Sequence, residues 1–251
     1  MLLAIDIGNS SAKVGFFEAG SLSVSFRIPP EQPFSAAVVF EAISRDPDRK
    51  PAHAVISTVV PDSLPAFETA ARRITGTDPL VADHSMYFGF EIDYRPVEDC
   101  GLDRLLAASA AVERVGYPCI VCDLGTAATI DLVDKDRVYR GGTIAPGMRV
   151  LFRSLHGNTA RLPLLDTEAA ENVVGNSTRA AITSGVYFGF AGLVDGIIER
   201  MMNEAGSEVP VIATGGDSGL VSAVSKYATE TAPDLVLEGL ALLHARNRRR
   251  S

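Results

Sequence analysis

The chain has 251 residues, 47% of them hydrophobic, and a formal net charge of −8 at pH 7. This length and apolar content suffice to bury one large core or two moderate ones. The acidic balance argues against nucleic acid or an anionic membrane as a partner, because it supplies no broad cationic field. The one basic cluster, Arg246 to Ser251, is expected to be a frayed and solvated C-terminus.

The first part of the chain predicts strands and helices in the order βββαβαβ. Three short strands, with a turn at Ala19-Gly20, indicate an antiparallel meander. Ser35 is the expected N-cap of the first helix. The strands are expected at residues 2–8, 12–18, 22–28, 53–60 and 79–83, and the helices at residues 35–45 and 62–75.

A loop over residues 91–104 leads into an Ala- and Leu-rich helix at residues 102–116, and the pattern then restarts. Strands are expected at residues 119–125, 128–134, 137–147 and 209–217, and helices at residues 148–158, 183–206, 218–227 and 235–247. The helix at 183–206 contains glycines at positions 185, 189, 192 and 196. These glycines indicate either that another backbone or a ligand approaches the helix closely, or only that the helix tolerates glycine there.

Both three-strand openings begin with Asp-x-Gly, in "DIGNSSAKVG" at residues 6–15 and in "DLGTAATID" at residues 123–131. Alternation of strands and helices favours an α/β protein. The repeated opening predicts two related halves, residues 1–115 and residues 116–251.

The cysteines and the N-terminus both favour a reduced, cytoplasmic location. The chain has three cysteines, and Asp6 interrupts the first apolar run too early for a signal peptide. No stretch of ~18 uninterrupted apolar residues indicates a transmembrane helix. Cys119 and Cys122 form a C-x-x-C on a predicted strand, where residues three apart point to opposite faces, so we expect both to be small buried apolar residues.

A carboxylate at the end of a strand, followed at once by glycine, suits a phosphate site. Glycine lets a ligand approach the backbone, and nearby hydroxyl and N–H groups bind phosphate oxygens. Because Asp repels phosphate, it implies a cation between them, most often Mg²⁺. Two such turns facing across a cleft would hold a nucleotide triphosphate. The alternative is that each Asp only caps a turn and each Gly only relieves strain.

Motifs of other nucleotide-binding and hydrolytic folds are missing from the sequence. It contains no G-x-x-x-x-G-K-[ST], no G-x-G-x-x-G after the first strand and no G-x-S-x-G. These absences leave the paired ribonuclease-H-like domains of the sugar kinase, actin and heat-shock ATPase superfamily, which place a nucleotide cleft between them.

An ordered set of motifs resembles the type III pantothenate kinase family over essentially the whole chain. The motifs are "DIGNSSAKVG", "STVVPD", "DYRPVEDCGLDR", "DLGTAATID", "GGTIAPGM", "TARLP", "GNSTRAAITSG" and "ATGGD". The resemblance implies ATP-dependent phosphorylation of pantothenate to 4'-phosphopantothenate, the first step of coenzyme A synthesis. It also implies a homodimer that uses Mg-ATP and a monovalent cation, K⁺ or NH₄⁺.

By this resemblance the first half binds Mg²⁺ and the ATP phosphates, with Asp6 organising the metal. The matched residues are Asp6, Gly8, Asn9, Ser10 and Lys13. The second half takes the cation and adenosine. Asp123 matches the monovalent-cation ligand and Thr126 an ATP contact, while Gly215 and Gly216 stand where the backbone passes close to adenosine.

On the acceptor side, Asp103 matches the general base that takes the proton from the pantothenate hydroxyl. Arg104 matches a substrate anchor; its guanidinium suits the pantothenate carboxylate, although a contact to the transferring phosphate stays open. The residues matched to the substrate site are Tyr94, Gly101, Leu102, Asp103, Arg104 and Thr178.

Each of these roles has an alternative. Asp103 would alternatively cap its helix or pair with Arg104, Tyr94 would be a packed aromatic ring, and Arg104 a surface ion-pair partner. For the whole chain the alternatives are a non-enzymatic regulatory or accessory protein that kept the fold, or another small-molecule kinase of the superfamily. Retention of Asp103 and Asp123 speaks against a regulator.

Overall fold

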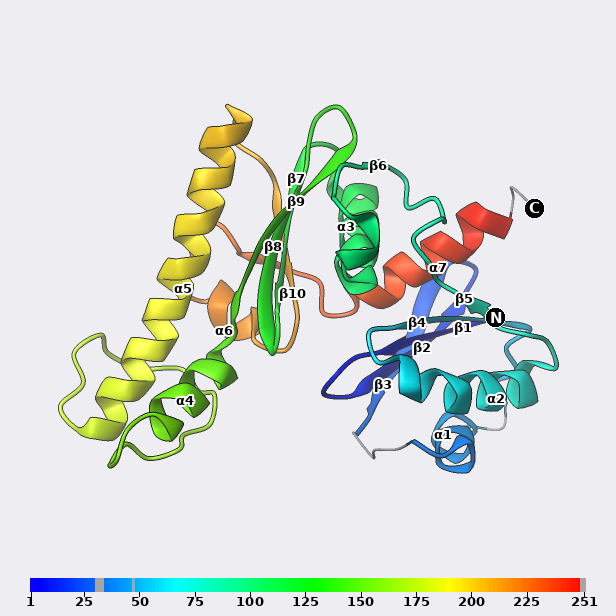
Figure 1. The fold of residues 1–251 in the computed structure, drawn as a ribbon, viewed down its shortest axis with the longest axis horizontal. Coiled ribbons are helices and arrows are strands. Elements are labelled where there is room, and N and C mark those ends of the chain that lie inside the picture. The colour runs from blue at the N-terminus through cyan, green and yellow to red at the C-terminus, as the bar shows by residue number, and fades with distance from the viewer. Residues whose placement is uncertain (30–33, 47, 249–251) are drawn as a thin grey trace. The chain divides into compact units, whose positions relative to one another are not determined.

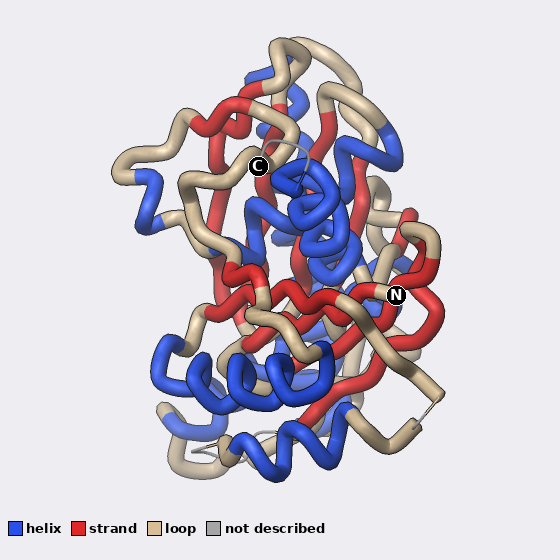
Figure 2. The backbone as a smooth tube through the Cα atoms, turned by 90° about the vertical axis from the view of Figure 1, so that its right-hand side faces the viewer, coloured by secondary structure: helices blue, strands red, loops and turns tan. Residues whose placement is uncertain are grey.

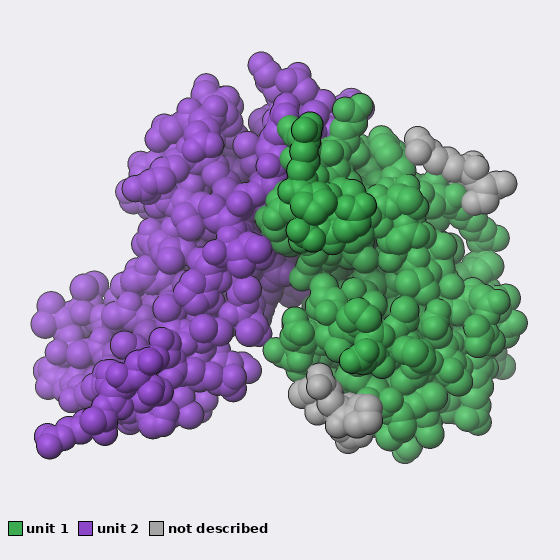
Figure 3. All heavy atoms as spheres, in the orientation of Figure 1, with its two compact units in different colours: residues 1–110, 234–251 green, residues 111–233 purple. Residues whose placement is uncertain are grey.

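The computed structural model describes residues 1–29, 34–46 and 48–248 (Figure 1). Within them the chain forms two compact units, coloured separately in Figure 3. The first unit contains residues 1–110 and the C-terminal segment from Asp234, and the second contains residues 111–233. The predicted α/β class is confirmed. The division at residue 115, with a phosphate side and a cation side, stays a prediction.

The first unit is built on a five-stranded sheet in the order β3-β2-β1-β4-β5. Its strands are β1 (Leu2–Ile7), β2 (Ala12–Glu18), β3 (Ser21–Ile28), β4 (His53–Thr58) and β5 (Leu80–Val81). The first three are antiparallel neighbours, so the predicted meander is confirmed, whereas β4 runs parallel to β1. Because β4 runs parallel to β1, the C-terminal ends of these two strands lie side by side at one edge of the sheet.

Helices cover both faces of this sheet (Figures 1 and 2). On one face, α1 (Ala36–Ile43) packs against α2 (Leu64–Thr75), and on the other α7 (Leu235–Arg248) lies along β1 and β4. The Ser35 side chain accepts a hydrogen bond from the Val38 amide at 3.2 Å, which confirms the predicted N-cap. Helix α3 (Leu102–Val115) approaches α7 closely, since a Cβ on Gly239 would overlap the Leu106 carbonyl group.

The second unit repeats the strand order of the first. Its own strands lie in the order β9-β8-β7-β10-β11. They are β7 (Cys119–Leu124), β8 (Ala127–Val133), β9 (Val138–Pro146), β10 (Val211–Thr214) and the two-residue β11 (Glu230–Thr231), which the sequence did not predict. Strands β7, β8 and β9 form an antiparallel meander, and β10 runs parallel to β7. This matching topology is what the duplicated opening predicted.

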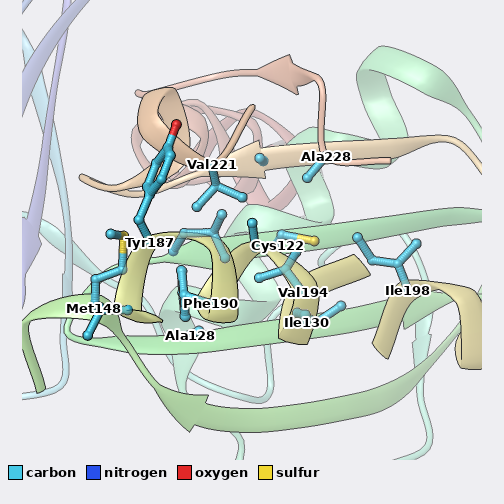
Figure 4. Close-up of a cluster of buried hydrophobic side chains, with 14 of the residues drawn as sticks. Cys122, Ala128, Ile130, Met148, Tyr187, Phe190, Val194, Ile198, Val221 and Ala228 are labelled. Carbon is cyan, nitrogen blue, oxygen red and sulfur yellow. The ribbon is translucent and has the colours of Figure 1, made fainter. Parts of the chain in front are cut away.

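Helix α5 (Thr178–Ala205) fills the core of the second unit (Figure 4). Its buried side chains pack with those of β7, β8 and of helices α4 (Met148–Gly157) and α6 (Ser218–Ser222). Cys119 and Cys122 belong to the fully buried residues of β7, and burial raises the pKa of the Cys119 thiol to about 12. Both are free cysteines, so their prediction as buried apolar residues is confirmed.

Helix α5 starts earlier than predicted, because Ser177 caps it and accepts a hydrogen bond from the Ala180 amide at 3.2 Å. It is the one described helix long and apolar enough to cross a membrane, but half of its most apolar window is buried inside the protein. Close approach within the described chain does not explain three of its glycines. A Cβ on Gly185, Gly189 or Gly192 would meet no described atom within 4 Å.

Three further predictions need correction. The stretch 91–104 is not only a loop, because it contains the short strand β6 (Glu91–Ile92) and a 3-10 turn, η2 (Val97–Asp99). Another 3-10 turn, η1 (Pro61–Ser63), precedes α2. Helix α6 is five residues long, half the predicted length. The basic tail is helical to Arg248, and Arg246 is anchored by hydrogen bonds, so this part is not frayed. The rest of the tail lies outside the described residues.

Candidate functional site

Four polar residues form one row across the sheet of the first unit. Asp6 on β1 is directly opposite Lys13 on β2, and it is opposite Ser57 on β4. Lys13 is in turn opposite Arg27 on β3. Residues directly opposite in a ladder project from the same face. The row therefore places one carboxylate, one hydroxyl and two cations side by side.

Asp6 is the electrostatic centre of this row. The pKa of Asp6 is raised to about 6, chiefly by burial and also by the negative charge of Asp103. A hydrogen bond from Ser57 Oγ to Asp6 Oδ1, at 2.6 Å, works in the opposite direction, as do the charges of Lys13 and Arg27. Two carboxylates whose charges repel favour a cation beside them.

The turn after β1 is closed by its own backbone. The Gly8 amide donates to the Ser11 carbonyl at 3.1 Å, and Arg27 Nη1 donates to Ser11 Oγ at 3.1 Å. The intervening Asn9 and Ser10 are exposed. These contacts put the predicted phosphate segment and the basic end of the row together.

Lys13 is held by the first residue before α7. Its Nζ lies 3.0 Å from Asp234 Oδ1, and both side chains are largely buried. Burial would raise the pKa of Asp234, but hydrogen bonds from Ser25 and Lys13 and the charges of Lys13 and Arg27 lower it overall. The ammonium group is therefore ordered, and Asp234 was not singled out by the sequence.

Asp103 lies in the first turn of α3, within reach of the charge on Asp6. Asp103 is the second residue of the helix, and its Oδ1 accepts a hydrogen bond from the Arg104 amide at 2.9 Å. A Cβ at Gly101 would overlap Asp103 Oδ1, so a larger residue there would displace the carboxylate. Accepting this hydrogen bond does not prevent Asp103 from taking a proton from an alcohol, because one carboxylate has two oxygens and about four acceptor sites.

Arg104 and Tyr94 form the adjacent pair. Arg104 is 5% exposed, so it is not a surface ion-pair residue. Its guanidinium carbon lies 5.4 Å from the centre of the Tyr94 ring, and Nη1 is 3.4 Å from the Tyr94 hydroxyl. A buried guanidinium stacked on an aromatic ring has a fixed orientation, which suits recognition of a planar carboxylate. The neighbouring Leu102 is buried and fixes the start of the helix.

The equivalent row in the second unit is neutral apart from its carboxylate. Asp123 on β7 is opposite Thr129 on β8 and Thr214 on β10. Thr129 is opposite Ile144, whose side chain is exposed. The row therefore offers oxygen atoms and no cation. Oxygen ligands suit a hard metal cation, and a single carboxylate suits one of low charge.

A glycine turn packs against the end of β7. Gly215 has a φ of +91°, and a Cβ there would overlap the Leu124 carbonyl and crowd the Asp123 carboxylate. The Asp217 amide donates to the Leu124 carbonyl at 2.9 Å, which joins the two segments. A Cβ on Gly216 would meet no described atom within 4 Å. The backbone at Gly216 is therefore open to a ligand.

The remaining predicted residues of the second unit are exposed. Thr126 follows Gly125 in the turn, where its carbonyl accepts from the Gly147 amide at 3.0 Å. Thr178 is the first residue of α5. No cluster of three or more His, Cys, Asp or Glu side chains that could hold a metal is found in the described part of the chain. A Mg²⁺ ion held mainly by phosphates and one or two carboxylates needs no such cluster.

Comparison with known proteins identifies the family. A sequence model of the type III pantothenate kinases matches residues 2–200. This chain belongs to the type III pantothenate kinase family. A type III pantothenate kinase of Anaeromyxobacter sp. is 38% identical over 255 residues, covering 99% of this chain and 100% of that one. Another, from Finegoldia magna, is 34% identical over 257 residues, covering 99% and 98%.

Solved structures confirm the fold class of this pantothenate kinase family member, two ribonuclease-H-like domains of the actin-like ATPase type. A ROK family glucokinase from Streptomyces griseus, solved with glucose and AMPPNP, has a TM-score of 0.54 at 12% identity, with 97% and 99% coverage. A protein of Campylobacter jejuni described as a Baf family transcriptional activator has a TM-score of 0.63 at 20% identity, with 98% and 99% coverage. At these identities the likeness concerns the fold alone.

The structure adds residues to those found in the sequence. Ser57 lay within a quoted motif, but its bond to Asp6 depends on the parallel pairing of β1 and β4. Arg27 gave no signal, because only the register of the meander places it beside Lys13. The roles assigned to the individual site residues stay predictions.

Proposed function

We propose that this kinase transfers the γ-phosphoryl group of ATP to the primary hydroxyl of pantothenate, with Asp103 as general base. This is the first step of coenzyme A synthesis. The observation that carries the assignment is the polar row at Asp6, where a buried carboxylate accepts a hydrogen bond from Ser57 and lies opposite Lys13, together with the charge of Asp103 on α3 that acts on it. An Asp that only stabilised the start of a helix would not need a second carboxylate within electrostatic range. A phosphate-transfer site does, because it requires both a metal ligand and a base.

On the donor side, the ATP phosphates bind the turn at residues 8–11 and the cations Lys13 and Arg27. Asp6 would hold Mg²⁺, which supplies neutralisation of phosphate charge when bound. Asp234 keeps the Lys13 ammonium in place before nucleotide arrives. Positioned charges of this kind stabilise the transferring group without reorganisation during the reaction.

On the acceptor side, Asp103 takes the hydroxyl proton of pantothenate. The Arg104 guanidinium, stacked on Tyr94, binds the pantothenate carboxylate. Gly101 and Leu102 present the base at the start of α3, and Thr178 contributes to the same substrate. Burial of Arg104 against the Tyr94 ring supports this role, because it gives the guanidinium a fixed orientation.

The second unit would bind the monovalent cation, K⁺ or NH₄⁺, at Asp123, and contact ATP through Thr126. The open backbone at Gly216 and the turn at Gly215 would lie against adenosine. A neutral row of oxygen atoms around one carboxylate supports a singly charged ion.

The enzyme is proposed to be a cytoplasmic homodimer. Gly185, Gly189 and Gly192 leave one face of α5 open within the described chain. Beside it, Val173 and Val174 are 70% and 86% exposed, and Ser184 Oγ donates to the Val173 carbonyl at 2.5 Å. A small-residue helix face flanked by exposed valines suits close packing against a second copy. Light scattering of wild type and Gly189→Arg tests it: a wild-type monomer would contradict the proposal.

The function is tested by coupled measurement of ADP release with pantothenate, Mg²⁺ and K⁺. We expect turnover in the wild type and a loss of roughly 10³-fold in kcat for Asp103→Asn, the size expected for a general base. Asp99→Asn, an exposed carboxylate in the preceding turn, is the matched control. Equal kcat in Asp103→Asn and wild type would overturn the role of Asp103. A panel of sugar and carboxylic acid acceptors tests the alternative hypothesis, that the protein is another small-molecule kinase of the superfamily.

The Campylobacter jejuni structure gives one specific reason to keep a regulatory alternative, because a protein described as a transcriptional activator shares the fold. Calorimetry distinguishes the two functions. Binding of both ATP and pantothenate supports the kinase, whereas binding of neither would favour the regulator.

A further inference from the structure

The C-terminal helix α7 is hydrogen-bonded to the loop that precedes the acceptor residues. Arg246 Nη1 donates to the Phe88 carbonyl and to Ser109 Oγ, both at 2.5 Å. Ser109 Oγ itself donates to the Phe88 carbonyl at 2.7 Å. One guanidinium thus joins α7, the loop and the middle of α3, all within the first unit.

The loop is shaped around this guanidinium. Gly89 has a φ of +107°, and a Cβ there would lie 2.8 Å from Arg246 Nη1. The next residue of α7, Asn247, pairs with the backbone of Tyr87 in both directions. Its Oδ1 accepts from the Tyr87 amide at 3.1 Å, and its Nδ2 donates to the Tyr87 carbonyl at 3.3 Å.

The same loop is tied to the start of α3 by His84. His84 Nε2 lies 2.7 Å from the carbonyl oxygen of Cys100. Because a carbonyl only accepts, Nε2 must carry the proton. Cys100 directly precedes Gly101, so this bond ends beside the residues that present Asp103. The stretch from His84 to Cys100, which includes Tyr94, is therefore held at its own two ends and by α7.

We propose that Arg246 and Asn247 position the pantothenate-binding segment, so that the last turn of the chain sets acceptor affinity. Arg246 is a positioning residue: it acts through residues 84–100 on Tyr94 and Arg104. The inference rests on the proposed assignment of these two residues to the pantothenate site. It gives a role to Arg246, the first residue of the basic cluster, which the sequence predicted to be a solvated tail.

The test compares steady-state kinetics of Arg246→Gln, Arg246→Lys and Asn247→Ala with the wild type. The matched control is Arg248→Gln, an exposed arginine on the same helix. We expect the KM for pantothenate to rise about tenfold in Arg246→Gln, because a small displacement of binding groups costs this much or more. The KM for ATP and kcat at saturation should stay within about twofold. Arg246→Lys should recover part of the loss, and Arg248→Gln should behave as wild type.

A purely structural role would give a different pattern. If Arg246→Gln lowers the thermal midpoint but leaves the KM for pantothenate unchanged, or raises both KM values equally, the proposal is wrong. Asn247→Ala removes three hydrogen bonds, two to Tyr87 and one to the Leu243 carbonyl, and it gives the same readout if Arg246→Gln does not fold.

Arg104→Gln separates the inference from the site assignment. A raised KM for pantothenate in Arg104→Gln, together with an unchanged KM in Arg246→Gln, overturns the positioning role alone. Unchanged values in both variants overturn the acceptor-site assignment and the positioning role with it.

Discussion

The two units share one strand order and one acidic turn, yet they surround the acid differently. In the first unit, Asp6 stands in a row with Ser57, Lys13 and Arg27. In the second, Asp123 occupies the same place on β7, and its row contains Thr214, Thr129 and Ile144. The backbone is repeated, while the charge around the carboxylate is not.

This difference assigns different chemistry to equivalent positions. Two cations beside a carboxylate suit a ligand that carries several negative charges together with Mg²⁺, as ATP does. A carboxylate among hydroxyl groups suits a single positive charge. The fold thus supplies two copies of one turn, and we expect the residues opposite each Asp to decide what it binds.

The largest expected effect comes from changing the residue opposite each Asp. Lys13→Met should raise the KM for ATP about 100-fold, because a charge-assisted hydrogen bond contributes roughly 1.5–3 kcal/mol. Thr129→Val, at the equivalent place in the second unit, should change it by less than about threefold. Steady-state ATP titrations at fixed Mg²⁺ measure both. Similar losses in the two variants would contradict the division of roles.

Removal of the Asp6 charge should stabilise the protein. The pKa of Asp6 is about 6 in the fold against an ordinary 3.8. Because the folded value is the higher one, ionisation costs stability as the pH rises from 3.8 to 6, and the cost stays constant above 6. Asp6→Asn should therefore gain about 3 kcal/mol at pH 7.5 and very little near pH 4.

Urea denaturation of Asp6→Asn at both pH values measures this gain, with Asp99→Asn as the exposed control. A stabilisation of equal size at both pH values would show that shape, and not charge, is responsible. Activity of the variant should be lost at either pH.

The next effect concerns the monovalent cation. Activity should be about tenfold higher in K⁺ or NH₄⁺ than in Na⁺ if a site selects ions by size and oxygen ligands. Asp123→Asn should abolish that difference. Thr129→Lys should also reduce it, because it brings an ammonium group next to Asp123, as Lys13 does next to Asp6. Equal rates of the wild type in all three salts would remove the cation role from Asp123.

The smallest effect is expected at Cys122, which precedes Asp123 as Ile5 precedes Asp6. Cys122 is fully buried, and burial followed by the charges of Asp131, Asp123 and Asp195 raises the pKa of its thiol. Native protein should therefore not react at Cys122 with iodoacetamide at pH 7.5, as measured by mass spectrometry. Cys122→Val should cost less than about 1.5 kcal/mol, because it is close to volume-conserving. Rapid labelling of the folded enzyme would contradict this environment.

The sequence was reliable where a signal is local. The three successive short strands with turns between them that begin at Asp6 and at Asp123 predicted both sets of strands, and the Ser35 hydroxyl predicted a helix start. It was misleading for α5, whose start depends on Ser177, and for the basic tail, where Arg246 is fixed by a carbonyl that lies 158 positions away in the sequence.

The sequence by itself determined the family, the α/β class, the duplication and the identity of both acidic turns, because motifs and short-range periodicity are written in consecutive residues. The tertiary structure alone decided which residues stand opposite Asp6 and Asp123, because register is set by strands that are distant in the chain. It also brought Asp103 within range of Asp6 and placed Arg246 against the loop before Tyr94. Charge coupling and hydrogen bonding act through space, so these relations appear only once the chain has folded.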